Sequence, residues 1–109
     1  MLPLPHTLSV MDAYLKQIDS YLKGDATNFW DFYNWFQDAF FGDKILEQRK
    51  GLKLDEFAFL NEISDMLGYA GTDPTDEERN DGIIDQYEFQ DQLKNFKSKN
   101  LFIWKRYGM

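Results

Sequence analysis

The sequence predicts an all-α protein, an antiparallel four-helix bundle with a long acidic loop between its third and fourth helices and an apolar, basic C-terminal tail. Apolar residues recur at three- and four-residue steps in four segments, and no convincing strand-like alternation occurs. The 109 residues fit one domain, residues 1–109, with a single core. We place this core at about residues 8–99 and the tail at residues 100–109.

The first two helices are expected on either side of a short polar turn. Gly24 is expected to end the first helix as a left-handed cap. Thr27 is expected to cap the second helix, residues 28–41, whose inward face is aromatic. The residues expected to face inward are Leu8, Met11, Tyr14, Leu15, Ile18, Tyr21 and Leu22 in the first helix, and Phe29, Phe32, Tyr33, Phe36 and Phe40 in the second.

The third and fourth helices are expected to flank the acidic loop. The third follows a polar connector, residues 43–53, and runs from about residue 55 to residue 69. The fourth runs from residue 86 to about residue 99, and Asp85 with Glu88 resembles a capping box at its start. The residues expected to face inward are Phe57, Leu60, Ile63, Met66 and Leu67, then Phe89, Leu93 and Phe96.

The formal charge of −7 is concentrated in one stretch, residues 73–91. This stretch holds eight acidic residues and one base, Arg79, whereas the remaining residues carry eleven acids and eleven bases. A field of this kind attracts a basic protein or a cation and repels nucleic acid. The eight acids are Asp73, Asp76, Glu77, Glu78, Asp81, Asp85, Glu88 and Asp91.

Catalytic chemistry finds little support in the sequence, and we expect neither an enzyme nor a cofactor. The chain has no cysteine, which excludes disulfides, thiolate metal sites and cysteine nucleophiles. The single histidine, His6, directly follows Pro5 in a terminal segment rather than lying beside a partner for proton transfer. No phosphate-binding glycine loop, nucleophile elbow or histidine-based metal motif is present.

The sequence also indicates a cytoplasmic protein with no membrane partner. Its apolar runs are too short to cross a bilayer. The first ten residues lack a basic region and contain Pro3 and Pro5, which is not typical of a secretion signal.

A calcium-binding loop is one alternative for the acidic stretch. Setting Gly82 at the turn position of an EF-hand loop puts three carboxylates at oxygen-supplying positions. The first half of the loop fits poorly, because Glu77 stands where aspartate is usual and Arg79 stands where an oxygen ligand belongs. This alternative calcium site comprises Glu77, Asp81, Asp85 and Glu88. We prefer the helix cap as the interpretation of its last two residues.

A decoy for a nucleic-acid-binding surface is another hypothesis. Nucleases bind phosphates through lysine and arginine clusters, so a rigid array of carboxylates can occupy the same cleft. Association would then be fast, electrostatically steered and weakened by salt. A soluble connector without a binding role is the simpler interpretation of the same composition.

The order of helices, turn and acidic loop along the chain is similar to that of a known protein family. The first helix closes in a polar turn at residues 21–27, and Phe29 opens the second helix. The third helix runs into an acidic loop, residues 64–81, which ends in Gly82 and Ile83 before the last helix. Over roughly residues 9–98 this order resembles the small helical immunity proteins of the colicin D type and of contact-dependent growth inhibition systems. The tail has no counterpart in that pattern.

The resemblance implies a non-enzymatic inhibitor of one cognate bacterial toxin. Such a protein would plug the basic cleft of a nuclease domain, typically one that cuts tRNA, as a monomer in a 1:1 complex. Tyr69 lies in the same segment and is a candidate aromatic contact, or else a cap on the core. The expected partner-binding residues are Asp65, Tyr69, Asp73, Asp76, Glu77, Glu78 and Asp81.

The basic tail and the tryptophans leave two further possibilities. The last sixteen residues carry five positive charges and no negative one, so the tail could fold back on the acidic loop and neutralise part of it. Trp30, Trp35 and Phe41 lie off the inward face of the second helix. An acidic adaptor or assembly module would use an aromatic face around Trp30, Trp35 and Trp104.

Overall fold

The computed structural model describes residues 10–24, 28–41 and 51–109. Within these ranges the chain is helical apart from turns and one isolated β-bridge, so the predicted all-α class is confirmed. The helices are α1 (Val10–Lys23), α2 (Phe29–Phe41), α4 (Leu54–Gly68), α5 (Asp76–Asn80), α6 (Gln86–Lys99) and α7 (Leu101–Arg106). None of these described helices is long and apolar enough to cross a membrane.

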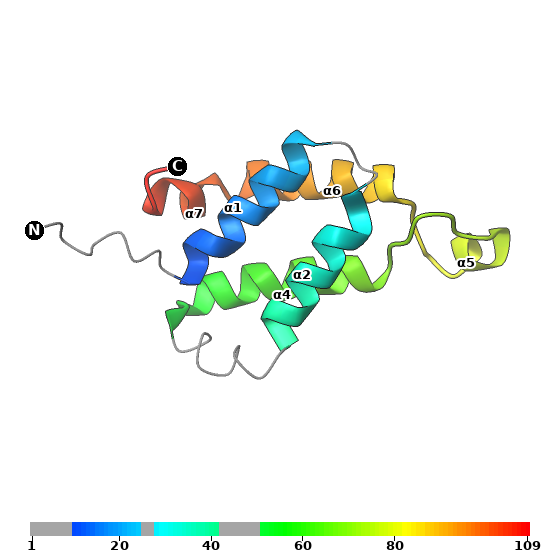
Figure 1. Cartoon of the computed structure of the whole chain (residues 1–109), viewed down its shortest axis with the longest axis horizontal. Coiled ribbons are helices and arrows are strands. Elements are labelled where there is room, and N and C mark those ends of the chain that lie inside the picture. Colours follow the sequence, from blue (N-terminus) through cyan, green and yellow to red (C-terminus); the bar gives the residue numbers. More distant parts are fainter. Residues whose placement is uncertain (1–9, 25–27, 42–50) are drawn as a thin grey trace, which may run out of the picture.

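Four of the helices pack around one core. Helix α1 contacts α2 and α6, and α4 contacts the same two helices. Figure 1 shows α4 and α6 running in opposite directions, with α1 and α2 inclined to them. This arrangement buries one face of each helix, as the three- and four-residue spacing of the apolar side chains predicts.

Aromatic rings fill the centre of this core. Tyr21 stacks on Phe32 with ring centroids 4.7 Å apart, and Phe29 meets Phe89 edge to face at 5.4 Å. Edge-to-face and offset pairs of this kind add to the stabilisation that burial alone provides. The predicted inward residues of the second helix are buried except Tyr33, which is half-buried. Those of the first helix are buried apart from half-buried Leu22 and from Leu8, which lies outside the described residues.

The predicted cap at Gly24 is only partly correct. Helix α1 does end at Lys23, but Gly24 is not among the described glycines with positive φ, which are Gly82 and Gly108. The Gly24 N–H bonds to the Tyr21 carbonyl at 3.2 Å, so a tighter turn closes the helix without a left-handed residue. The predicted N-cap Thr27 lies outside the described residues.

The inward face of α4 differs from the prediction. Leu60, Ile63 and Leu67 are buried as expected, whereas Phe57 and Met66 are only half-buried. Phe59 and Glu56 take their place, because the C-terminal residues cover this side of α4. Phe59 stacks on Phe96 at 5.0 Å and meets Trp104 edge to face at 5.6 Å. Phe96 itself is half-buried, and Phe89 and Leu93 are fully buried as predicted.

The tail forms helix α7, which attaches to α4 and α1. Arg106 binds the Asp55 carboxylate with two bonds of 2.8 and 3.0 Å and the Glu56 carboxylate at 2.8 Å. The Tyr107 hydroxyl also donates to Glu56, whose carboxylate is fully buried. We call these four residues the tail latch. Burial, together with the Glu56 carboxylate, raises the pKa of Tyr107 to about 12.

The indole of Trp104 makes the second attachment of the tail. Its N–H lies 3.1 Å from both Asp19 carboxylate oxygens, and Lys97 binds the same carboxylate at 2.6 Å. The suggestion that the tail folds back on the acidic loop is therefore wrong. Figure 1 shows α7 and α5 at opposite ends of the molecule.

Candidate functional site

The acidic arm is the segment between α4 and α6, residues 70–84, and backbone pairing joins its two ends. The Gly71 N–H donates to the Ile84 carbonyl, and the Ile84 N–H donates to the Tyr69 carbonyl, both at 2.9 Å. These bonds form an isolated bridge between Ala70 and Ile84. Because the base of the arm is closed, the residues between project beyond the ends of α4 and α6 (Figure 1).

The middle of the arm is helix α5 rather than the continuous loop that the sequence predicted. Thr75 caps its start: the Thr75 hydroxyl accepts from the Glu78 N–H at 3.1 Å, and the Glu78 carboxylate accepts from the Thr75 N–H at 2.9 Å. At its end, the Ile83 N–H bonds to the Glu78 carbonyl and the Gly82 N–H bonds to the Arg79 carbonyl, each at 3.0 Å. Gly82 has φ +94°, the left-handed value that this C-terminal motif requires. Capping at both ends explains why so short a helix forms.

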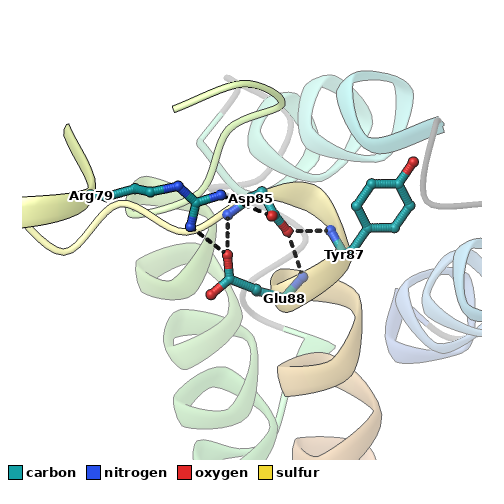
Figure 2. Close-up of polar contacts among 4 residues, drawn as sticks. All are labelled: Arg79, Asp85, Tyr87 and Glu88. Carbon is teal, nitrogen blue, oxygen red and sulfur yellow. Dashed lines mark hydrogen bonds and ion pairs between the residues drawn. The ribbon is translucent and has the colours of Figure 1, made fainter. Parts of the chain in front are cut away.

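Arg79 joins the arm to the start of α6. Its guanidinium donates to Asp85 at 3.0 Å and to Glu88 at 2.8 Å (Figure 2). The same carboxylates form the predicted capping box, which is confirmed. Asp85 accepts from the N–H groups of Tyr87 and Glu88 at 2.9 Å, and Glu88 accepts from the Asp85 N–H at 3.2 Å. We call Arg79, Asp85 and Glu88 the arm clamp.

The clamp defines the charge state of its members. The backbone N–H of Glu88 and then the Arg79 guanidinium lower the pKa of Asp85. The carboxylates of Glu88 and Asp85 in turn raise the pKa of Arg79. Asp85 and Arg79 are therefore both ionised at neutral pH, and the one base of the arm is already bound by two acids at the start of α6.

The alternative calcium site is not assembled in this arrangement. Two of its four residues, Asp85 and Glu88, bind Arg79 instead, and Glu77 and Asp81 lie on α5 and at its end. Across the part of the chain that the structure describes, no three side chains of the ligating types lie close enough to hold a metal ion. A guanidinium thus stands beside the carboxylates that a divalent cation would need.

The arm carries five acidic residues in an exposed setting. None of them forms an ion pair with any residue of the described ranges. They come from both sides of α5 along the chain and from α5 itself, so one small projecting unit holds five carboxylates. The five are Asp73, Asp76, Glu77, Glu78 and Asp81, all of them predicted site residues.

The other two predicted site residues lie at the C-terminal end of α4. Asp65 is exposed in the last turns of that helix. Tyr69 follows the helix directly and is 61% exposed, so it does not cap the core. Its carbonyl takes part in the bridge at the base of the arm, which places the tyrosine where the arm joins the helices. Both residues remain available to a partner.

Trp30 is a site residue that the predicted set omits. The indole is 45% exposed, and its N–H donates to the Thr72 hydroxyl at 3.1 Å across 42 residues of sequence. This bond ties the start of α2 to the arm. The signal available in the sequence was the position of Trp30 outside the inward face of its helix, but no local pattern pairs it with Thr72.

The three tryptophans do not form a common surface, which corrects one basis of the adaptor hypothesis. Trp104 is 2% exposed and binds Asp19, so it belongs to the core. Trp35 is half-buried and meets Tyr14 edge to face at 5.5 Å. Only Trp30 presents a large part of its ring to solvent.

Comparisons of the chain with protein-family models, with curated proteins and with solved structures gave no match. The acidic arm is the feature of the described residues that combines dense charge, exposure and a defined conformation. We take it as the candidate functional site on these physical grounds.

Proposed function

We propose that the protein is an immunity-type inhibitor that binds a cognate bacterial toxin through its acidic arm. The observation that carries this proposal is the separation of charge within the arm. Arg79, its one base, is held by two acids of α6, whereas the five acids of the arm have no ion-pair partner among the described residues. The arm therefore offers an uncompensated negative field to a partner.

A basic protein surface suits this field better than the alternatives. Nucleic acid carries the same sign of charge and would be repelled. A divalent cation would compete with Arg79 for Asp85 and Glu88. The cleft of a nuclease, by contrast, gathers lysine and arginine to hold phosphates, and carboxylates on a capped helix can replace those phosphates. We propose a (t)RNA-cleaving nuclease domain as the partner.

The proposed mechanism is binding without chemistry. The arm enters the basic cleft and excludes the RNA, while the remaining helices, which we propose form an antiparallel four-helix bundle, support its base. A conformation fixed in advance reduces the entropy lost on binding, and the bridge, the two caps and the clamp all supply such order. We further propose a 1:1 complex in the cytoplasm, where the toxin would meet its substrate.

Co-expression with the toxin encoded by the adjacent reading frame tests the proposal. The native protein should restore growth, and the variant Asp76→Lys/Glu77→Lys/Asp81→Lys, which we call the arm variant, should not. Glu78 is left unchanged because it caps α5. We expect the association rate to fall by about tenfold to a hundredfold, since steering by opposite charge is reversed. Association is measured by stopped-flow fluorescence or surface plasmon resonance.

The matched control reverses three exposed acids outside the arm, Asp31, Asp38 and Glu62, with the same change in net charge. This control should retain growth and most of the association rate, because local rather than total charge is proposed to act. An equal loss of association rate in both variants would mean that net charge, rather than the charge of the arm, determines binding. Full binding by the arm variant would place the interface elsewhere and contradict the proposal.

A further inference from the structure

A groove lies between the start of α2 and the acidic arm. It encloses about 390 Å³ and opens to solvent. Trp30 lines it from α2, the apolar residues Pro74 and Ile83 line it from the arm, and the acidic residues Asp73 and Glu78 are part of the same lining. The groove therefore combines an aromatic ring, aliphatic surface and negative charge within the space of one long side chain.

The aromatic wall of the groove is held in place. The Trp30 N–H binds Thr72 at 3.1 Å, and the indole meets Phe29 edge to face at 5.0 Å and Tyr33 at 5.1 Å. Phe29 is fully buried, so the ring rests on the core. The exposed part of the indole is a fixed surface rather than a freely rotating side chain.

One acid of the groove, Glu78, is held in place, and no lysine or arginine lines the groove. One oxygen of Glu78 accepts the Thr75 N–H, which positions its carboxylate as part of the α5 cap. The lining contains no lysine or arginine, and the neighbouring Arg79 is held by Asp85 and Glu88. A cation entering the groove would thus meet two carboxylates without an internal competitor.

We propose that this groove receives an arginine side chain of the partner protein. The acidic residues favour a cationic group. The exposed indole favours a planar cation, because a guanidinium stacks on aromatic rings and can donate two parallel hydrogen bonds to a carboxylate. Lysine lacks the planar group and would bind more weakly. The inference rests on the proposed function in assuming a basic protein partner, and it names the group that the groove recognises.

Titration with short capped peptides tests the groove without the toxin. The probes are acetyl-Gly-Arg-Gly-amide, its lysine counterpart and its citrulline counterpart, which keeps the shape of arginine and removes the charge. In 1H–15N spectra, the arginine peptide should shift the Trp30 indole N–H and the Ile83 amide at millimolar concentration. The indole signals of Trp35 and Trp104 serve as internal controls. The lysine peptide should bind about threefold to tenfold more weakly, and citrulline weaker still.

Two variants separate aromatic from acidic recognition. Trp30→Leu keeps an apolar side chain and should lower the affinity for the arginine peptide by about tenfold. Asp73→Asn/Glu78→Gln keeps shape and should remove the preference for arginine over citrulline. Equal binding of arginine and citrulline peptides to the native protein, or no shift at Trp30, would overturn the inference. So would a Trp30 shift on simple dilution of the protein, which would assign the groove to a second copy.

The outcomes for the groove and for the arm are distinguishable. Suppose Trp30→Leu binds the toxin normally while the charge reversals of the arm variant abolish binding. The proposed function then stands, and the groove inference fails. Suppose instead that the arm variant binds the toxin normally, but Trp30→Leu weakens the binding of both the toxin and the arginine peptide. The groove inference then stands, and the proposal that the charge of the arm drives binding fails.

Discussion

The Arg79 guanidinium lies 2.8 Å from the Glu88 carboxylate, and this contact joins the acidic arm to the start of α6. Arg79 belongs to α5, whereas Glu88 belongs to the first turn of α6. Asp85, the N-cap of α6, accepts a second bond from the same guanidinium at 3.0 Å. The arginine thus neutralises acids that serve the fold and leaves unpaired those that we propose serve binding.

Loss of the clamp should loosen the arm without unfolding the protein. In Arg79→Gln we expect amide hydrogen exchange at Gly71 and Ile84 to accelerate by about threefold to tenfold, because the bridge loses its support. The melting temperature should change by less than about 2 °C, since exposed ion pairs contribute little to global stability. Lys94→Gln, an exposed charge change on α6, is the control. Unchanged exchange at both amides would show that the bridge holds the arm by itself.

Calcium should not stabilise the native protein. Arg79 stands beside Asp85 and Glu88, so a divalent ion would first have to displace it. We expect no change in melting temperature at millimolar calcium and no heat in titration calorimetry, because a ligand stabilises only in proportion to its binding. A calcium-dependent rise in melting temperature would contradict the clamp as the resting arrangement.

The N-cap of α6 should contribute measurably to stability. Asp85→Ala removes the acceptor for the N–H groups of Tyr87 and Glu88, and we expect the free energy of unfolding to fall by about 1 kcal/mol. Asp85→Asn retains an acceptor and should recover most of this loss. Urea denaturation measures both. Equal loss in the two variants would point to the charge of Asp85, and so to Arg79, rather than to the cap.

Features set by neighbouring residues were predictable from the sequence. Apolar spacing located the inward faces of α1 and α2, and the three-residue interval from Asp85 to Glu88 located the cap of α6. These patterns are readable because the interacting groups lie within one or two turns. The N-cap of α5 has the same three-residue interval, from Thr75 to Glu78. We expected a loop in this segment and therefore did not predict the helix.

Features that join distant residues were not predictable from such patterns. Trp30 meets Thr72 across 42 residues, and Arg106 meets Glu56 across 50. The inward position of Glu56 is intelligible only once the tail covers α4, since the start of its own helix supplies one donor, the Lys53 N–H, and the tail supplies the others through Arg106 and Tyr107. For the candidate site, the acids were located by composition, whereas the groove beside them required the packing of α2.

The tail latch should make stability depend on pH through Glu56. Burial alone would raise the pKa of this carboxyl, but the Lys53 N–H, the Tyr107 hydroxyl and the Arg106 guanidinium together lower it below the usual 4.5. Because the folded-state pKa is depressed, the ionised form stabilises the fold above about pH 4.5. This contribution is lost as the pH falls through the folded-state pKa.

Glu56→Gln tests the latch directly. At pH 7 we expect the free energy of unfolding to fall by about 2 kcal/mol, because the buried amide replaces charge-assisted bonds with weaker ones. The difference from the native protein should shrink as the pH falls below 4.5 and through the folded-state pKa of Glu56, because this carboxyl then becomes protonated. Glu62→Gln, an exposed change on the same helix, should alter the free energy by less than about 0.5 kcal/mol at either pH. A constant difference between native protein and Glu56→Gln from pH 7 to pH 3 would mean that the charge of Glu56 does not join the tail to α4.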